Sequence, residues 1–423
     1  MRGFKTAGTF AGLPRHIVVL GAISFLTAMS SAIVYGLLPL FLVRVLHSSL
    51  ASVGLIEGMA EAGNSFMKIG SGLASDWLGR RKPIVAVGYV LSAIDKLLFP
   101  LANNVTTVLA ARLIDRLGKG IRDAPRDALL ADITPEPVRG KGFGLRLAFY
   151  TAGFVVGPLT AVTVMLLSHD DFRLVFWLAV IPAAVAIVVL LVALKEPRPL
   201  QVGAARPNCQ RDGPTRFPVR FWWVVTIAGL LSTARFSQAF LILKANEVGI
   251  DPAFAALTLV IMHLTYASAA YPFGILADRM DRRLQLEIGV GILIGADIML
   301  ANASTLLAVV AGAALWGLQL AVTQGLLSAA IAESSPERLR GRAFGFYELA
   351  VGVTAFVANL AAGTLWGFGG PVFAFGASAL IAGLTGIALL LLQMPRTTAA
   401  TEITERDDRS AARSSAQPRR DIR

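Results

Sequence analysis

Apolar runs of about 20 residues recur along this chain, and that is the length a helix needs to cross a bilayer. With 55% hydrophobic and 16% charged residues, 423 residues are too apolar for a soluble protein. We therefore expect an all-α membrane protein, and we read the first run as a retained helix because no signal-peptidase-like site follows it. The twelve predicted spans are residues 17–42, 52–73, 83–101, 105–127, 143–167, 173–194, 221–243, 253–275, 284–302, 305–331, 343–367 and 371–393.

A short charged loop occurs twice in the sequence. GLASDWLGRR occupies residues 72–81, and GILADRMDRR follows 202 positions later at residues 274–283. A second pair of loops, beginning at Asp132 and Glu333, repeats at an offset of 201. Two loops repeated at one spacing predict two pseudo-symmetric six-helix bundles, residues 1–194 and 221–394, joined by a Pro-rich linker at residues 195–220. The polar tail, residues 395–423, has no apolar face, and we expect it to be disordered.

The basic residues fall in alternate loops, together with the linker and both termini. The positive-inside rule therefore predicts cytoplasmic termini, and we expect a multi-pass protein of the bacterial cytoplasmic (inner) membrane. Topology explains most of the net charge of +12, so we expect no nucleic-acid partner. The loop cations are Arg80, Arg81, Lys82, Arg139, Lys141, Arg279, Arg282, Arg283, Arg338, Arg340 and Arg342.

The fourth span carries eight charged residues spaced three or four apart, which places them on one face of a helix. Each charge at the bilayer centre costs about 2.5 to 3.5 kcal/mol, so this face must line a wet cavity or pair internally. We expect a functional site here. The alternative is simple neutralisation near the rim, of Asp115 by Lys119 and of the later aspartates by neighbouring arginines. The eight are Arg112, Asp115, Arg116, Lys119, Arg122, Asp123, Arg126 and Asp127.

Further charges lie inside other predicted spans. Glu57, Glu61 and Lys68 share one face of the second span. Two buried neighbouring carboxyl groups readily share a proton, so the two glutamates are candidate proton carriers, unless they lie at a hydrated outer rim. Arg146 and Arg235 complete the predicted substrate or proton pathway, with Arg112, Asp115, Arg116 and Lys119 of the fourth span. Other intramembrane charges are Asp95, Lys96, Asp297 and Glu348.

The duplicated loop and the two-bundle pattern resemble the major facilitator superfamily. The first copy carries its loop motif at Gly72, Asp76, Gly79, Arg80 and Arg81; the second keeps Gly274, Asp278, Arg282 and Arg283 but has Asp281 where the family often has Gly. The resemblance implies a secondary transporter that works by alternating access. An aspartate held by a helix dipole and an arginine pair could form a conformational latch. The alternative is that these arginines only determine topology.

Two further patterns resemble motifs of antiporters in that superfamily. Gly153, Gly157 and Pro158 match a fifth-span motif, in which the glycines allow close packing and the proline would bend the helix. Arg112 begins a pattern similar to a fourth-helix motif that is associated with proton coupling. Residues 115–129 resemble a poorly characterised bacterial branch. Where that branch has acids, this chain has Ala28, Ala32, Tyr150 and Gln238, which favours an anionic substrate and weakens the case for ordinary proton antiport.

We therefore predict transport of a small anionic solute or chelate, with protons as a candidate coupling ion. The alternatives are a proton-coupled multidrug antiporter anchored by Glu57, Glu61 and Asp95, a metal or metal-chelate (iron-type) transporter, and a non-transporting sensor. No hydrolase, zinc-protease or Walker motif occurs, so we expect neither an enzyme nor an ATP-driven pump. We expect no cofactor, no metal site and a monomer in the lipid bilayer, and we read His263 as a packing residue.

Overall fold

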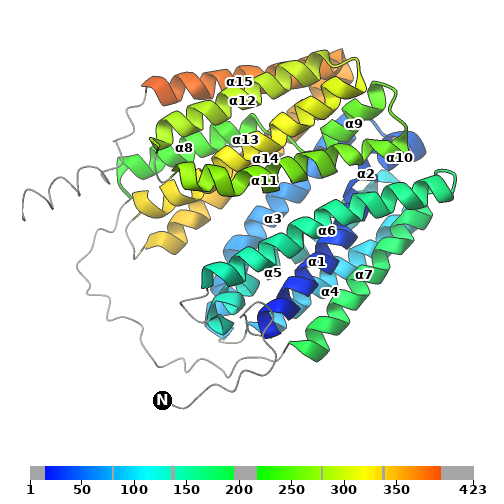
Figure 1. Cartoon of the computed structure of the whole chain (residues 1–423), viewed down its shortest axis with the longest axis horizontal. Helices are drawn as coiled ribbons and strands as arrows, with labels where there is room; N and C mark the ends of the chain where they lie inside the picture. The colour runs from blue at the N-terminus through cyan, green and yellow to red at the C-terminus, as the bar shows by residue number, and fades with distance from the viewer. Residues whose placement is uncertain are drawn as a thin grey trace, which may run out of the picture.

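A computed structural model describes residues 15–78, 81–134, 139–194, 217–277, 280–335 and 339–391. The start of α1 and the end of α15 lie at one end of the molecule, here called the terminal end; the opposite one is the distal end (Figure 1). The helices are α1 (Arg15–Tyr35), α2 (Leu38–Leu40), α3 (Leu50–Leu78), α4 (Lys82–Leu101), α5 (Val105–Ile133), α6 (Arg139–Leu167), α7 (Phe172–Ala193), α8 (Val219–Thr233), α9 (Ala239–Glu247), α10 (Pro252–Ala255), α11 (Leu257–Ala277), α12 (Arg282–Asn302), α13 (Leu306–Ser334), α14 (Arg340–Gly369) and α15 (Pro371–Leu391).

The helices form two groups, which we call the N-half (α1–α7) and the C-half (α8–α15). In the N-half, α1 packs against α6 and α7, and α5 packs against α3 and α4. In the C-half, α12 packs against α13 and α15, and α8 packs against α14. The halves meet where α3 contacts α14 and where α6 contacts α11. Their helices diverge toward the terminal end (Figure 1).

Close backbone approach joins the two halves at the distal end. A Cβ on Gly54, near the distal start of α3, would lie 2.2 Å from the carbonyl oxygen of Asn359 on α14. Arg44 donates a hydrogen bond of 2.5 Å to Asn246, which lies at the distal end of α9. Since only glycine permits the first contact, the sequence itself allows the halves to close here.

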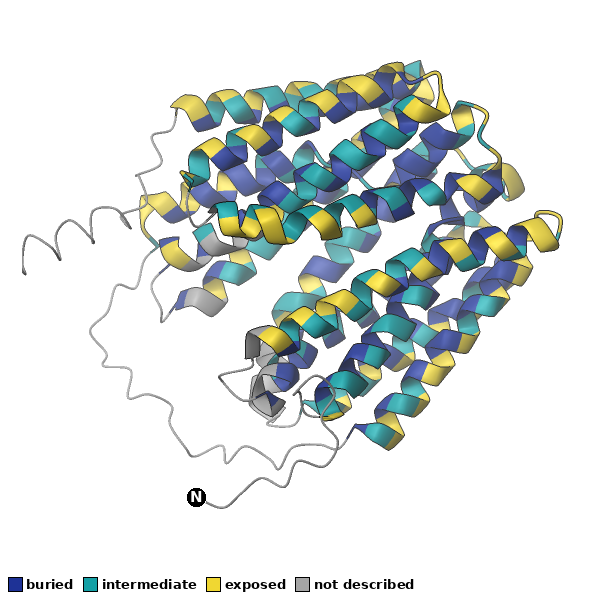
Figure 2. Ribbon diagram, viewed as in Figure 1, coloured by how far each residue is buried: buried dark blue, intermediate teal, exposed yellow. Residues whose placement is uncertain are grey.

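The outer surface of the bundle is apolar, as lipid contact requires. Exposed positions recur along α7 and α15 (Figure 2). They include Val188 on α7 and Leu384 on α15, which are 59% and 56% exposed. Nine helical segments of the described chain are long and apolar enough to cross a membrane. The α3 and α5 helices, of 29 residues each, are also long enough but carry several charges, and the span containing α8 is interrupted. The prediction of an all-α membrane fold is confirmed, and these helices are consistent with twelve spans.

The seventh span is broken, contrary to the prediction of one continuous helix over residues 221–243. The α8 helix ends at Thr233 and α9 begins at Ala239. Side chains from other helices bind the backbone groups that the break exposes: the hydroxyl of Ser378 donates to the carbonyl of Ala234, and the backbone N–H of Ser237 donates to Oδ1 of Asn359 at 2.6 Å. A break inside a membrane is stable only when its polar backbone finds such partners.

Two other predicted spans are also divided. The first consists of α1, α2 and a π-helix at Phe41–Val45, and the eighth consists of α10 and α11. Proline occupies the first turn of α2, at Pro39, and of α10, at Pro252, where its missing N–H costs nothing. Each set of segments still forms one candidate membrane span, Arg15–Val45 and Pro252–Leu276.

Two glycines of α6 bring it into close contact with α1. A Cβ on Gly153 would lie 2.5 Å from the carbonyl oxygen of Phe25 and 2.8 Å from Cβ of Ala28. Gly157 repeats this arrangement one turn later, 2.8 Å from Ala32. Small residues on both helices therefore produce the contact, and an acidic side chain at position 28 or 32 would not fit this packing. The α6 helix continues through residue 158, so the proline bend stays a prediction.

The glycine contact gives a first prediction. Gly153→Ala forces a methyl group against the backbone of α1, and overpacking of this kind costs about 1–3 kcal/mol. We expect a lower thermal unfolding temperature for the purified protein in detergent. The control is Gly144→Ala on the same helix, where a Cβ would meet no atom within 4 Å. Equal unfolding temperatures for the two variants would contradict the role assigned to Gly153.

Candidate functional site

The charged face of α5, defined by the eight charged residues predicted from the sequence, points into the N-half. Arg112, Asp115, Arg122 and Arg126 are buried, each at most 7% exposed. The α3 and α4 helices pack against α5 and supply most of the partners. The prediction that this face avoids lipid agrees with the geometry; its function in transport stays a prediction.

The distal part of the face holds a buried arginine–glutamate pair. Arg112 donates two hydrogen bonds to Glu57 of α3, from Nε at 3.0 Å and from Nη2 at 2.8 Å. The same guanidinium lies 3.9 Å from the ring centre of Tyr35 on α1. Glu57 also accepts a hydrogen bond of 2.8 Å from the hydroxyl of Ser237, in the break of the seventh span. One carboxylate thus joins the N-half to the broken helix of the C-half.

Next to this pair, one lysine lies between two aspartates. Nζ of Lys96, on α4, lies 2.6 Å from Asp95 and 3.2 Å from Asp115 of α5. The hydroxyl of Tyr35 donates to the other carboxylate oxygen of Asp115. All three charged side chains are at most 1% exposed. Asp115 is therefore paired with Lys96 from another helix and, at 3.7 Å, with Arg112 of its own helix, and not with Lys119 as the rim interpretation supposed.

The middle of the face pairs with α3 again. Arg116 lies 3.5 Å from Glu61, so the two predicted proton carriers, Glu57 and Glu61, each face a separate arginine. Lys68, also on α3, lies 3.3 Å from Glu348 on α14. This ion pair connects the two halves, so separating the halves at this level must break it.

Toward the terminal end, the charges pair much as the rim interpretation expects. Arg126 lies 2.8 Å from Asp123 and 3.1 Å from Asp127. Arg146 of α6 approaches Asp127 at 3.7 Å. Arg122 instead donates to the hydroxyl of Ser92 on α4. These contacts fix the terminal third of α5 against α4 and α6.

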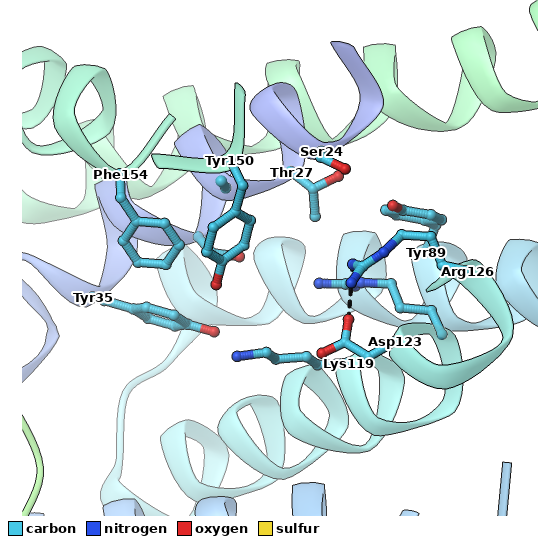
Figure 3. Close-up of a pocket in the computed structure, with 12 residues that line it drawn as sticks. Ser24, Thr27, Tyr35, Tyr89, Lys119, Asp123, Arg126, Tyr150 and Phe154 are labelled. Atoms are coloured by element: carbon cyan, nitrogen blue, oxygen red, sulfur yellow. Dashed lines mark hydrogen bonds and ion pairs between the residues drawn. The ribbon is translucent and has the colours of Figure 1, made fainter. Parts of the chain in front are cut away.

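A pocket opens between α1, α4, α5 and α6; about 370 Å³ of space free of protein atoms, open solvent included, lies within its outline (Figure 3). Three cations and one carboxylate line it: Lys119, Arg122, Arg126 and Asp123. The ammonium of Lys119 and the hydroxyls of Tyr35 and Tyr150 point toward one another (Figure 3). The other lining residues are Ser24, Thr27, Ala28, Ser31, Tyr89 and Phe154.

Lys119 differs from the other lysines of the N-half interior. Among the described residues, no carboxylate lies within 4.0 Å of its ammonium, whereas Lys68 and Lys96 have such partners. A cation in a partly dehydrated pocket attracts an anion strongly, because little water screens its charge. The pocket is therefore chemically suited to hold a negatively charged group beside Lys119.

The C-half contributes a second cation, which the break in the seventh span positions. Arg235 lies between α8 and α9 and donates a hydrogen bond of 2.6 Å to the hydroxyl of Thr323 on α13. No carboxylate of the described chain lies within ion-pair distance of it, and its Nε is buried without a partner. The sequence predicted Arg235 as a pathway residue but not the break that presents it.

The latch residues are only partly described. Gly79, Arg80 and Asp278 lie outside the described residues, as do the linker from 195 to 216 and the tail from 392, and the side chain of Asp76 is not described either. The C-half arginines make contacts within that half: Arg282 pairs with Glu333 of α13, and Arg283 lies 2.9 Å from Glu287. Gly72 and Gly274 lie within α3 and α11. The latch therefore stays a prediction.

Some site residues were not recognisable from the sequence. Tyr35 and Tyr89 look like ordinary span residues, and Ser237 is one of many serines. Only the fold brings them beside Asp115, Arg122 and Glu57. His263, read as a packing residue, stacks on Phe154 with ring centres 4.7 Å apart. No group of three metal-binding side chains occurs in the part of the chain that the structure describes.

The sequence and the fold both match known proteins. The family model of the Major Facilitator Superfamily matches residues 20–242 and 222–423. An uncharacterized MFS-type transporter of Methanocaldococcus jannaschii is 30% identical over 390 residues, which are 90% of this chain and 95% of that one. This chain belongs to the major facilitator superfamily. It is thus a multi-pass membrane protein of a transporter family, as the duplicated loops suggested.

This chain is also similar, more distantly, to a resistance protein and to a transporter of known structure. The quinolone resistance protein NorA of Staphylococcus aureus is 25% identical over 184 residues, covering 44% of this chain and 46% of NorA. The crystal structure of the nucleoside transporter NupG superposes with a TM-score of 0.75 at 14% identity, covering 89% of this chain and 99% of NupG. The second similarity concerns the fold alone.

The buried pair of Arg112 and Glu57 gives a prediction on stability. Arg112→Leu leaves a buried carboxylate unpaired, which typically costs about 3–5 kcal/mol, and Glu57→Leu does the same to the arginine. Replacing both residues together leaves no orphaned charge. We expect each single variant to unfold at a clearly lower temperature than the double variant, measured in one detergent. A double variant less stable than both single variants would show that the pair is not the source of the effect.

Proposed function

We propose that this protein is a secondary transporter that moves a small anionic solute, or an anionic chelate, across the cytoplasmic membrane by alternating access. The observation that carries the proposal is the positive charge of the pocket lining: Arg126 pairs with Asp123 and Asp127, but Lys119 and Arg122 have no carboxylate within 4.0 Å among the described residues. An anion bound in the pocket would neutralise the charge of Lys119.

The rest of the lining supports an organic solute. Tyr35, Tyr150 and Phe154 present aromatic surface, and the hydroxyls of Ser24, Thr27 and Ser31 can donate or accept hydrogen bonds. A mixture of apolar walls and a few converging polar groups is typical of small-molecule sites. The anionic group of the solute would bind at Lys119, and the aromatic rings would contact its carbon skeleton.

The arrangement of the halves supports a state open toward the cytoplasm. The halves touch at the distal end and diverge toward the terminal end (Figure 1). The alternation of basic loops supports a cytoplasmic position for the terminal end. To expose the pocket on the other side, the halves would close at the terminal end and break the distal contacts. Protons are one candidate for the ion that drives this cycle.

Proton-coupled drug efflux is the second candidate, because of the similarity to NorA. Binding a cationic drug requires a carboxylate that is free to receive it. The three proposed acidic anchors are already occupied: Glu57 by Arg112, Glu61 by Arg116 and Asp95 by Lys96. Charge balance thus favours the anionic solute.

The test is binding and flux of a panel of carboxylates, phosphate esters and ferric citrate, beside cationic dyes. One charged contact is worth about 1.5–3 kcal/mol, so Lys119→Ala should weaken binding of the selected anion about 10- to 100-fold. Lys119→Arg should retain most of it. The control is Lys141→Ala, which removes an exposed charge of α6. Binding of cationic dyes, with none of the anions bound, would overturn the proposal.

The ion pair between the halves gives a separate prediction. Glu348→Lys places a second cation beside Lys68, and like charges at this distance repel. Spin labels at Leu55 on α3 and Val357 on α14 should show a longer or broader distance distribution in this variant. Adding Lys68→Glu reverses the pair and should restore the distribution. If the distance distribution of the double variant differs from that of the wild type as much as that of the single variant does, the ion pair does not hold the halves together.

A further inference from the structure

A buried acid of the C-half, Asp297 on α12, takes no part in the site described above. Its side chain is 0% exposed. Nε1 of Trp316 on α13 donates to one carboxylate oxygen at 3.2 Å, and Oγ of Ser378 on α15 lies 2.5 Å from the other. No lysine or arginine of the described chain lies within 4.0 Å of it. An ionised carboxylate buried in this way, without a cation, is very costly.

The hydroxyl of Ser378 has two acceptors but only one hydrogen. Besides Asp297, it contacts the carbonyl oxygen of Ala234, where α8 ends. The described backbone supplies no other donor to that carbonyl. With Asp297 ionised, two hydrogens, from Trp316 and Ser378, face three acceptors: the two carboxylate oxygens and the Ala234 carbonyl. One buried acceptor is then left unsatisfied, at a cost of about 1–3 kcal/mol.

One added proton satisfies every group. A protonated Asp297 donates its O–H to Oγ of Ser378, which is then free to donate to Ala234, while Trp316 still donates to the carbonyl oxygen of the acid. We propose that Asp297 is a proton-binding site and that its proton completes a chain from α12 through α15 to the break in the seventh span. When the carboxyl group gives its proton to water, Ser378 turns to the carboxylate and releases the carbonyl of Ala234.

The surrounding elements supply no competing charge near Asp297. The α15 helix has no ionisable residue from Pro371 to Leu391. The guanidinium of Arg235 binds Thr323, two turns or about 10 Å along α13 from Trp316. On α12, the nearest other charge is ten residues away, about 15 Å along the helix. The remaining ionisable residues on helices that contact this position, Arg220, Lys244, Glu247, Arg282, Arg283 and Glu333, lie toward the helix ends.

The consequence concerns the same broken helix that presents Arg235 and Ser237. Ala234 directly precedes Arg235, and Ser237 donates to Glu57 of the N-half. Loss of the proton would free the backbone of the break and let these two side chains move relative to α13 and to the N-half. This proton site goes beyond the proposed function, because it does not depend on which solute occupies the pocket.

Infrared difference spectroscopy of the purified protein tests the proton directly. At neutral pH, the wild type should show the carbonyl stretch of a protonated carboxylic acid, and Asp297→Asn should lose it. Ser378→Ala removes the acceptor, so the band should remain but shift to higher frequency; this reading holds even if the asparagine variant folds poorly. Glu287→Gln on the same helix is the control and should leave the band unchanged. A band absent from the wild type, or unchanged in both test variants, would overturn the proposal.

The effect of this proton on the break in the seventh span can be measured separately. The side-chain amide of Asn at position 297 can donate to Ser378 as the protonated acid does. Ser378 should then keep its hydrogen bond to the carbonyl of Ala234 at any pH. Spin labels at Leu147 on α6 and Ile275 on α11, in a Cys209→Ser background, should report a distance shift in the wild type as pH rises. Asp297→Asn should abolish that shift. If Asp297→Asn shifts like the wild type, the Asp297 proton does not control the break in the seventh span. The infrared result and the anion-binding proposal would be unaffected.

Discussion

The structure depends on the pairing of the charges that α5 carries into the membrane. A single unpaired charge at this depth is costly, so most of the buried charges of this helix need partners, many of them from neighbouring helices. The α3 helix supplies Glu57 and Glu61 to Arg112 and Arg116, and α4 supplies Lys96 to Asp115. These ion pairs specify how α3, α4 and α5 pack. Among the described residues, Lys119 and Arg122 have no carboxylate within 4.0 Å, and in our proposal the solute binds beside Lys119.

The same network extends into the other half of the molecule. Glu57 binds both Arg112 and the hydroxyl of Ser237, while Lys68 pairs with Glu348. A change in the relative tilt of the halves therefore alters the environment of Glu57 and Lys68. In our proposal, anion binding beside Lys119 and movement of the halves are coupled through α5, which carries both Lys119 and the Arg112 that binds Glu57. This is the physical link between occupancy and alternating access in our proposal.

The sequence was sufficient to predict the membrane fold, because apolar runs and duplicated loops follow directly from bilayer thickness and from the two-bundle arrangement. It also predicted which face of the fourth span is buried, since residues three to four apart share a helix face. It did not predict the pairing of Asp115 with Lys96, because which helices become neighbours is a tertiary property. The break at residues 234–238 was also missed: it contains no proline or glycine, and it is stabilised by Asn359 and Ser378, more than 100 positions away.

The central claim is that the charged face of α5 is reached by water from the terminal end and is shielded from lipid. It can be tested by labelling Lys119→Cys, in a Cys209→Ser background, with a membrane-impermeant thiol reagent. The account predicts that the reagent labels this cysteine in inside-out vesicles, whereas Val188→Cys on the apolar surface of α7 stays unlabelled. Labelling of position 188 with none at position 119 would contradict it.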